Sequence, residues 1–167
     1  MKAFRMMLVL GLAACASTGS GPEASDGAVP AFPEAFAGSW QACDGASSPS
    51  ECSRYVLVQR GERICGIWSY VASGKEYEGR VIARASSATQ ARRTHVCGRP
   101  GAEAGRECGE GWEAVDRPLL LCDGRLGDTL RADGTCFADF EAVPASRSGI
   151  AALSAQPWVE DCLVRDP

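Results

Sequence analysis

Residues 54–71 read RYVLVQR-GE-RICGIWSYV. β-Branched and aromatic residues fill both arms of this stretch, which is typical of strands that pack on at least one face. Between the arms stands Gly61-Glu62, a two-residue turn signal of the kind that joins antiparallel strands. The pattern predicts a β-hairpin with strands at 54–60 and 63–71.

Further strand signals follow the hairpin. A second turn, Ser-Gly-Lys-Glu at residues 73–76, leads into YEGRVIAR at 77–84, where small or apolar residues alternate with polar ones. A period of two predicts a half-buried antiparallel strand. A weaker strand is expected at 88–96, in which Gln90, Arg92 and Arg93 indicate a sheet edge or a solvated face.

The C-terminal half carries the same signals more sparsely. LLLC at 119–122 predicts a short buried strand that ends at Asp-Gly, and a second Asp-Gly at 133–134 precedes a strand at 135–143. Residues 97–111 hold five glycines without periodicity and predict a long loop that its cysteines order. Residues 150–164 predict a short helix or a final strand, pinned by Cys162. Turn signals at intervals of roughly 8–12 residues favour an all-β fold, an antiparallel β-barrel or sandwich.

The N-terminus has a different character. Lys2 and Arg5 precede a short apolar run, and residues 12–15 are Leu-Ala-Ala-Cys. A charged start, an apolar region and a small-residue cleavage site form the layout of a secretory signal peptide. The stretch at 12–15 resembles the lipobox of bacterial lipoproteins. The resemblance implies that Cys15 becomes the first mature residue and carries acyl chains that hold the protein stably on a membrane.

This interpretation divides the chain into three parts. They are a lipoprotein signal peptide at 1–14, the lipidated Cys15 with a flexible Gly/Ser/Pro-containing linker at 15–35, and one folded domain at 36–167. Ala16 stands where an aspartate would resemble an inner-membrane retention signal of Gram-negative bacteria. The resemblance therefore favours the outer membrane, with the domain facing the periplasm or the cell surface. The apolar run is well short of the roughly twenty residues of a transmembrane helix.

The cysteine count agrees with an exported protein. The chain has nine cysteines, and lipidation of Cys15 leaves eight in an oxidising compartment, which predicts four disulfides. The eight are Cys43, Cys52, Cys65, Cys97, Cys108, Cys122, Cys136 and Cys162. Short separations favour the pairs Cys43–Cys52, Cys97–Cys108 and Cys136–Cys162, which leaves Cys65–Cys122. The cross-links compensate for a thin core, because Leu, Ile, Val and Phe make up about 18% of residues 36–167.

Several function classes find no support in the sequence. Loss of Lys2 and Arg5 with the signal peptide would leave 15 basic against 21 acidic residues, a net charge near −6, which is no footprint for nucleic acid. His95 is the single histidine, without an evident nucleophile or orienting partner. No nucleophile elbow, phosphate-binding loop or Cys-x-x-Cys pair is present in the sequence. We therefore expect a non-catalytic domain without a metal or cofactor.

Gly38-Ser39-Trp40 resembles the Gly-x-Trp motif of lipocalins and related calycin barrels, where it lies near the start of the first strand and closes the barrel end. The resemblance implies a small hydrophobic ligand held in the barrel mouth, in an apolar pocket near Trp40 and Trp68. The alternative is that Trp40 is only a core anchor.

The segment ASGKEY at 72–77 is similar to the Ser-Gly-x-x-Tyr stretch of the membrane-bound and periplasmic c-type lysozyme inhibitors. The resemblance implies a loop that enters the lysozyme cleft, with Ser73 and Lys75 as the residues to test. The Trp-x-Lys-Gly of that family is absent, and only Glu110-Gly111-Trp112 stands nearby. A turn between two strands is by itself sufficient reason for Ser-Gly-Lys-Glu.

The sequence thus predicts a lipid-anchored envelope protein whose disulfide-bonded β domain binds a small hydrophobic ligand or another protein. A lysozyme-inhibitor-like role and a structural role in the envelope remain open alternatives.

Overall fold

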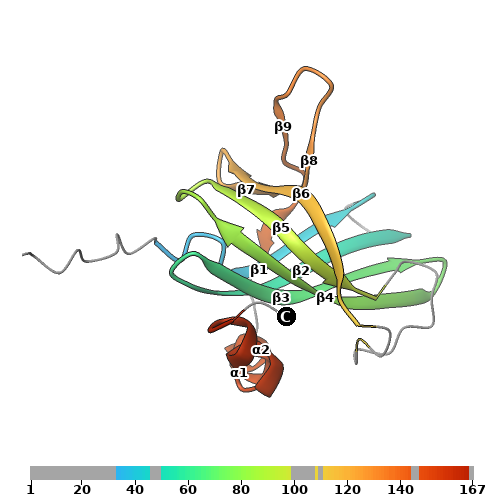
Figure 1. Ribbon diagram of the computed structural model, residues 1–167. Coiled ribbons are helices and arrows are strands. Elements are labelled where there is room, and N and C mark those ends of the chain that lie inside the picture. The colour runs from blue at the N-terminus through green and yellow to red at the C-terminus, as the bar shows by residue number, and fades with distance from the viewer. Residues whose placement is uncertain (1–32, 46–49, 99–107, 109–110, 144–146, 166–167) are drawn as a thin grey trace, which may run out of the picture. The chain divides into compact units, whose positions relative to one another are not determined.

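The computed structural model describes residues 33–45, 50–98, 108, 111–143 and 147–165. Cys15 and nearly all of the predicted signal peptide and linker therefore lie outside the described residues. Eight strands form one antiparallel sheet in the order β10-β1-β2-β3-β4-β5-β6-β7, and β8 pairs with β9 in a small second sheet (Figure 1). The strands are β1 (Gly38–Cys43), β2 (Glu51–Arg60), β3 (Arg63–Ala72), β4 (Lys75–Ala85), β5 (Gln90–Cys97), β6 (Glu113–Cys122), β7 (Arg125–Gly127), β8 (Thr129–Leu130), β9 (Cys136–Phe137) and β10 (Glu141–Val143).

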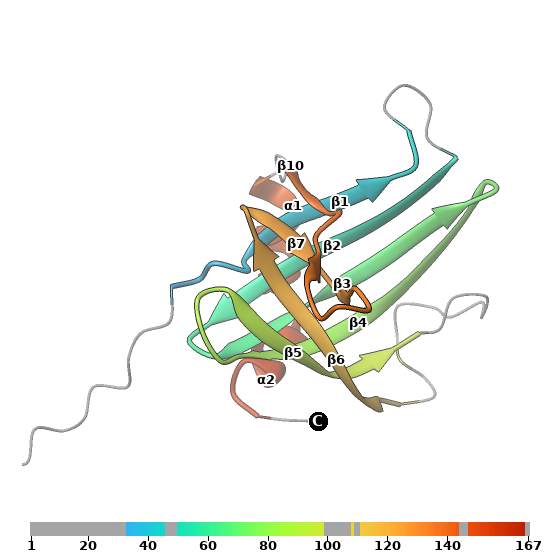
Figure 2. The same ribbon diagram turned by 90° about the horizontal axis from the view of Figure 1, so that it is seen from above.

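The large sheet curls until its two edges meet. Leu126 of β7 and Phe140, just before β10, exchange two backbone hydrogen bonds with N···O distances of 2.9 and 3.0 Å. Because β10 pairs with β1 at the other end of the strand order, these bonds nearly close the sheet into a barrel. Of the two predicted all-β alternatives, a barrel and a sandwich, the fold is therefore the barrel. Figure 2 shows β5 and β6 crossing in front of β2, β3 and β4.

Three tight turns set the strand register as the sequence predicts. β2 and β3 are joined by Gly61-Glu62, with a positive φ of 59° at the glycine. Ser73-Gly74 joins β3 to β4, and Asp123-Gly124 joins β6 to β7, with positive φ at all four of these residues. Two-residue turns of this kind match the right-handed twist of the strands that they connect.

The barrel interior holds the main core. Side chains alternate in and out along each strand, so one face of β1–β6 points inward. The buried interior residues are Phe36, Trp40, Tyr55, Leu57, Ile64, Val81, Ala83, Ala85, Ala91, Leu119, Leu126 and Phe140. Gln59 is the buried polar residue among them, and its Oε1 accepts a hydrogen bond from the backbone N–H of Phe36 at 3.0 Å. This contact fixes the segment that enters β1.

A second, smaller core covers the outer face of β2, β3 and β4. The strand sequence YVLV at 55–58 is apolar on both faces, which is typical of a strand that is covered on both sides. The outward Val56 and Val58 pack with helices α1 (Arg147–Ser154) and α2 (Pro157–Cys162), which lie together beside β2 and β3 (Figure 1). The C-terminal segment at 150–164, which was predicted to form a short helix or a final strand, is thus helical.

Four disulfides join the eight cysteines, and two of the predicted pairs are confirmed: Cys43–Cys52 and Cys97–Cys108. The other two predicted pairs are wrong, because Cys65 bonds Cys162 and Cys122 bonds Cys136. The β8–β9 hairpin folds back against β6, which places Cys136 beside Cys122. Cys162, at the end of α2, is then left to bond the outward-facing Cys65 of β3.

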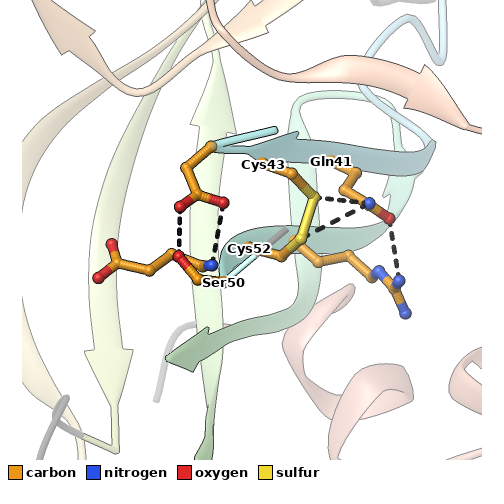
Figure 3. The surroundings of a disulfide bond; sticks show 7 residues. Gln41, Cys43, Ser50 and Cys52 are labelled. Atoms are coloured by element: carbon orange, nitrogen blue, oxygen red, sulfur yellow. Dashed lines mark hydrogen bonds between the residues drawn. A yellow bond between two sulfur atoms is a disulfide. The ribbon is translucent and has the colours of Figure 1, made fainter. Parts of the chain in front are cut away.

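The Cys43–Cys52 bond holds the open ends of β1 and β2 together (Figure 3). Gln41 directs its amide nitrogen toward the two sulfurs, and its Oε1 accepts a hydrogen bond from Nη2 of Arg54 at 2.9 Å. Arg54 is exposed, and this bond holds its guanidinium on the outer face of the sheet.

Three strand predictions need correction. The strand at 88–96 is not a sheet edge, because β5 pairs with both β4 and β6. The strand at 119–122 is the end of the longer β6, whose first half has charged residues and Pro118 instead of an apolar run. The single strand expected at 135–143 is split into β9 and β10. The chain is outside the barrel in the β8–β9 hairpin, where Phe137 is exposed, and rejoins the barrel at Phe140, which is buried.

Candidate ligand-binding site

A cavity of about 420 Å³ lies at one end of the barrel interior. Its volume is in the range of small-molecule sites in proteins. The lining comes from β2, β3, β5 and the segments that flank the closing contact of the sheet. It consists of Ser53, Arg54, Tyr55, Trp68, Ser69, Tyr70, Arg93, Val96, Gly98, Asp128 and Phe140.

Strand register places the cavity next to the solid core. Tyr55 pairs with Trp68 and Ser53 with Tyr70, so two successive inward rows of β2 and β3 line the cavity. The next inward row toward the Gly61 turn contains Leu57, which is fully buried. The barrel is therefore filled with side chains at the end that carries the Gly61-Glu62 turn and hollow at the opposite end, where Tyr70 lies.

Aromatic rings form the apolar wall of the cavity. The rings of Tyr55 and Phe140 lie 5.2 Å apart at an interplanar angle of 59°. The Trp68 indole lies against Gly79 of β4, where a Cβ atom would collide with the ring and with the carbonyl of Cys97. A glycine at this position is what allows the indole to approach the backbone of β4 this closely.

An irregularity in β5 turns two of its residues into the cavity. The pairing of β5 shifts between Arg93 and His95 on both sides: Thr94 is an extra residue relative to β4, whereas toward β6 it is β6 that has one residue more than β5. Such a bulge interrupts the alternation of side chains along a strand. As a consequence Arg93 and Val96, three positions apart, both line the cavity.

The polar part of the site is an ion pair bridged by a phenol. Nη1 of Arg93 lies 2.9 Å from the hydroxyl of Tyr55 and 3.4 Å from Oδ2 of Asp128, and Nη2 donates to the backbone carbonyl of Asp128 at 3.0 Å. The Tyr55 hydroxyl donates to Oδ2 of Asp128 at 2.8 Å. The side chains of Arg93 and Asp128 are only 16% and 24% exposed. The three groups form one closed hydrogen-bonded cluster.

Burial, with a further contribution from the Asp128 carboxylate, raises the pKa of Tyr55 far above its ordinary value. The phenol therefore stays protonated and keeps its donor role toward Asp128. The Nε atom of Arg93 is buried and has no hydrogen-bond partner among the described residues. It is closed to solvent, so the cluster presents no spare guanidinium donor at this atom.

Of the predicted binding residues, the structure brings one to the cavity. Trp68 lines it, whereas Trp40 is buried in the core and its Nε1 donates to the carbonyl of Phe36 at 3.1 Å. Trp40 thus has the anchor role that was the alternative to a pocket residue. Ser73 and Lys75 are exposed at the turn between β3 and β4 and are not part of the lining.

The sequence does not identify Tyr55, Arg93, Asp128 and Phe140 as site residues, although all four line the cavity. The one local signal was an arginine within a predicted strand. Nothing local marks Asp128, which lies in a turn-rich segment 35 residues from Arg93.

The described residues contain no group of three or more His, Cys, Asp or Glu side chains that could hold a metal ion. His95 contacts Thr94, with 3.1 Å between Nδ1 and Oγ1, and does not line the cavity. Within the described part of the chain, no helix is both long and apolar enough to span a bilayer.

The fold and the site define a disulfide-bonded antiparallel barrel with a half-open aromatic cavity. Comparison of the chain with protein-family models, curated proteins and solved structures finds no match in any of the three.

Proposed function

We propose that the chain is a lipid-anchored envelope protein whose barrel binds a small, largely apolar ligand without catalysing a reaction. The observation that carries the proposal is the cavity of about 420 Å³ lined by Tyr55, Trp68, Tyr70 and Phe140. Aromatic walls with a few fixed polar groups are the usual composition of small-molecule sites. Burial of a ligand's apolar surface against these rings supplies the affinity.

Filling the cavity is expected to abolish binding. The test uses the mature chain (residues 15–167) carrying Cys15→Ser, exported with an ordinary signal peptide so that it forms disulfides but lacks acyl chains. The neutral probe N-phenyl-1-naphthylamine is expected to bind saturably, with an increase in its fluorescence. In Ser53→Phe the new ring occupies the cavity, and the affinity is expected to fall about tenfold or more.

Ser86→Phe is the matched control, because Ser86 is exposed after β4 and is not part of the lining. It is expected to leave probe binding unchanged. Absence of saturable binding to the parent chain, or equal affinities of Ser53→Phe and Ser86→Phe, would contradict a ligand site at the barrel mouth.

The membrane anchor is tested separately. Full-length chain is expected to incorporate labelled palmitate and to fractionate with the outer membrane, because two or more acyl chains give stable anchoring. Cys15→Ser is expected to incorporate no label and to be released from the membrane. A Cys15→Ser chain that is still labelled and retained would refute the anchor without affecting the cavity.

A further inference from the structure

Two of the three charged residues that line the cavity neutralise each other. Its charged lining residues are Arg54, Arg93 and Asp128. Arg54 is exposed and hydrogen-bonded to Gln41, and alternation along β2 places its side chain on the outer face, opposite to those of Ser53 and Tyr55. The interior charge is therefore one positive and one negative group, in direct contact at 3.4 Å.

An anionic ligand would find no free cation in this cluster. Nη1 of Arg93 is engaged by Tyr55 and Asp128, Nη2 by the Asp128 carbonyl, and Nε is closed to solvent. An anion could pair with Arg93 only by displacing the Asp128 carboxylate, which would then be left half-buried without its counter-ion. Breaking a buried ion pair in this way is strongly unfavourable.

A cationic ligand meets the same obstacle with opposite sign. Oδ2 of Asp128 accepts from Tyr55 and Arg93, and Oδ1 accepts from the Thr129 hydroxyl at 3.2 Å. A cation that approached Asp128 would also approach the Arg93 guanidinium. Arg93 thus repels cations and Asp128 repels anions, and each already neutralises the other. The aromatic rings remain accessible to an apolar ligand.

We propose that the barrel mouth selects an uncharged ligand. Arg93 and Asp128 are each other's counter-ion, so an anion or a cation that bound at this pair would have to disrupt it. This inference rests on the proposed function, because it specifies the class of ligand for the same cavity. Specificity here comes from the penalty against charged competitors as much as from contacts with the ligand that fits.

Two probes with one ring system test the inference. N-phenyl-1-naphthylamine is neutral, and 1-anilinonaphthalene-8-sulfonate is the same skeleton with an anionic sulfonate. Only the binding that Ser53→Phe removes is counted, so that sulfonate bound elsewhere on the surface is excluded. The unlipidated mature chain is expected to bind the neutral probe about tenfold or more tightly than the sulfonate.

Asp128→Asn is expected to release the guanidinium and to raise the affinity for the sulfonate about tenfold, while the affinity for the neutral probe stays within about threefold. Asp123→Asn is the matched control, since Asp123 is exposed in the turn between β6 and β7, where asparagine also tolerates the positive φ of 53°. It removes the same charge and is expected to change neither affinity.

The outcomes separate the two proposals. If neither probe shows binding that Ser53→Phe removes, the ligand site itself is refuted and the selectivity falls with it. If the parent chain binds the sulfonate at the mouth as tightly as the neutral probe, the ligand site stands and the inference is overturned. The comparison of the two probes on the parent chain decides this even if Asp128→Asn fails to fold.

Discussion

Asp128→Ala is expected to lower the free energy of unfolding by about 2–4 kcal/mol. The substitution leaves the Arg93 guanidinium, 16% exposed, without a counter-ion and removes the acceptor of the Tyr55 hydroxyl. Removing one partner of a fully buried pair costs about 3–5 kcal/mol, and the residual exposure of 16% and 24% places this pair somewhat lower. Urea unfolding of the mature chain, followed by circular dichroism, measures the change as a lower midpoint at constant slope.

The neighbouring residue of β5 supplies a matched control. Arg92 pairs with Asp116, but both side chains are largely exposed, at 61% and 75%. Asp116→Ala is expected to change the free energy of unfolding by no more than about 0.5 kcal/mol, because exposed ion pairs are screened by water. If Asp128→Ala costs no more than Asp116→Ala, the Arg93–Asp128 pair is not the buried cluster that the geometry describes.

The double variant Arg93→Met/Asp128→Leu separates the charge from the contact. It replaces both charged groups with apolar ones of similar size, so no unpaired charge remains. Most of the loss in Asp128→Ala is expected to be recovered, although Tyr55 then lacks an acceptor.

These two arginines also show where reading the sequence reaches its limit. Arg92 and Arg93 are adjacent and chemically identical, and both were assigned to an edge or a solvated face. The prediction holds for Arg92, which is exposed on the outer face. It fails for Arg93, because its burial depends on a carboxylate 35 residues away and on a strand that has neighbours on both sides. Local pattern cannot supply either of these non-local facts.

Hairpins were predictable for the opposite reason. Gly61-Glu62, Ser73-Gly74 and Asp123-Gly124 carry their geometry in the turn residues themselves, and each joins two strands that are adjacent in the sequence. The number of such strands predicted an all-β fold, a barrel or a sandwich, without distinguishing the two. What the turns do not determine is the contact that closes the sheet, between Leu126 and Phe140, because it joins short segments with weak strand signals.

The same distinction explains the two tryptophans. Trp40 and Trp68 both point inward, on strands that flank β2 on either side, and Tyr55 pairs with both. Both were predicted to lie near the pocket, and a core anchor was the alternative for Trp40 alone. The Trp40 indole donates a hydrogen bond to the carbonyl of Phe36 and is buried in the core. The Trp68 indole lies against Gly79 and lines the cavity.

Short separations identify disulfide partners where neighbouring segments of the chain fold against each other, as for the pairs 9, 11 and 14 residues apart. Cys43 and Cys52 face each other in the register of β1 and β2, so their separation of 9 residues was informative. The rule failed for Cys162, whose partner Cys65 lies 97 residues away. Outward-facing residues of β2–β4 form an apolar surface that the C-terminal helices cover, and this packing, not proximity in sequence, selects the pair.

Removing that long-range disulfide is expected to have the largest effect on stability. Cys65→Ala/Cys162→Ala is expected to lower the free energy of unfolding by about 3–5 kcal/mol, because a cross-link that closes a loop of roughly 100 residues removes much of the entropy of the unfolded chain. Cys43→Ala/Cys52→Ala opens a loop of only 9 residues and is expected to cost less, below about 3 kcal/mol. Both variants lose two cysteines and leave no free thiol, so urea unfolding compares loop length directly.

In the folded state, the Cys65–Cys162 bond also determines which part of the chain unfolds first. The helix α2 has six residues, too few to be stable alone, and it is held by the buried Val159 and Cys162, by the Arg60–Glu160 ion pair and by the Arg63 guanidinium on the Cys162 carbonyl. Limited proteolysis of Cys65→Ala/Cys162→Ala is therefore expected to cleave the C-terminal helices before the barrel, and Cys43→Ala/Cys52→Ala to leave them protected. If both variants lose the same stability and show the same cleavage pattern, the contacts of α2 alone hold the outer layer. The disulfide would then add nothing specific to Cys65 and Cys162. The expected difference arises because the bond ties the end of α2 to β3 in the middle of the sheet.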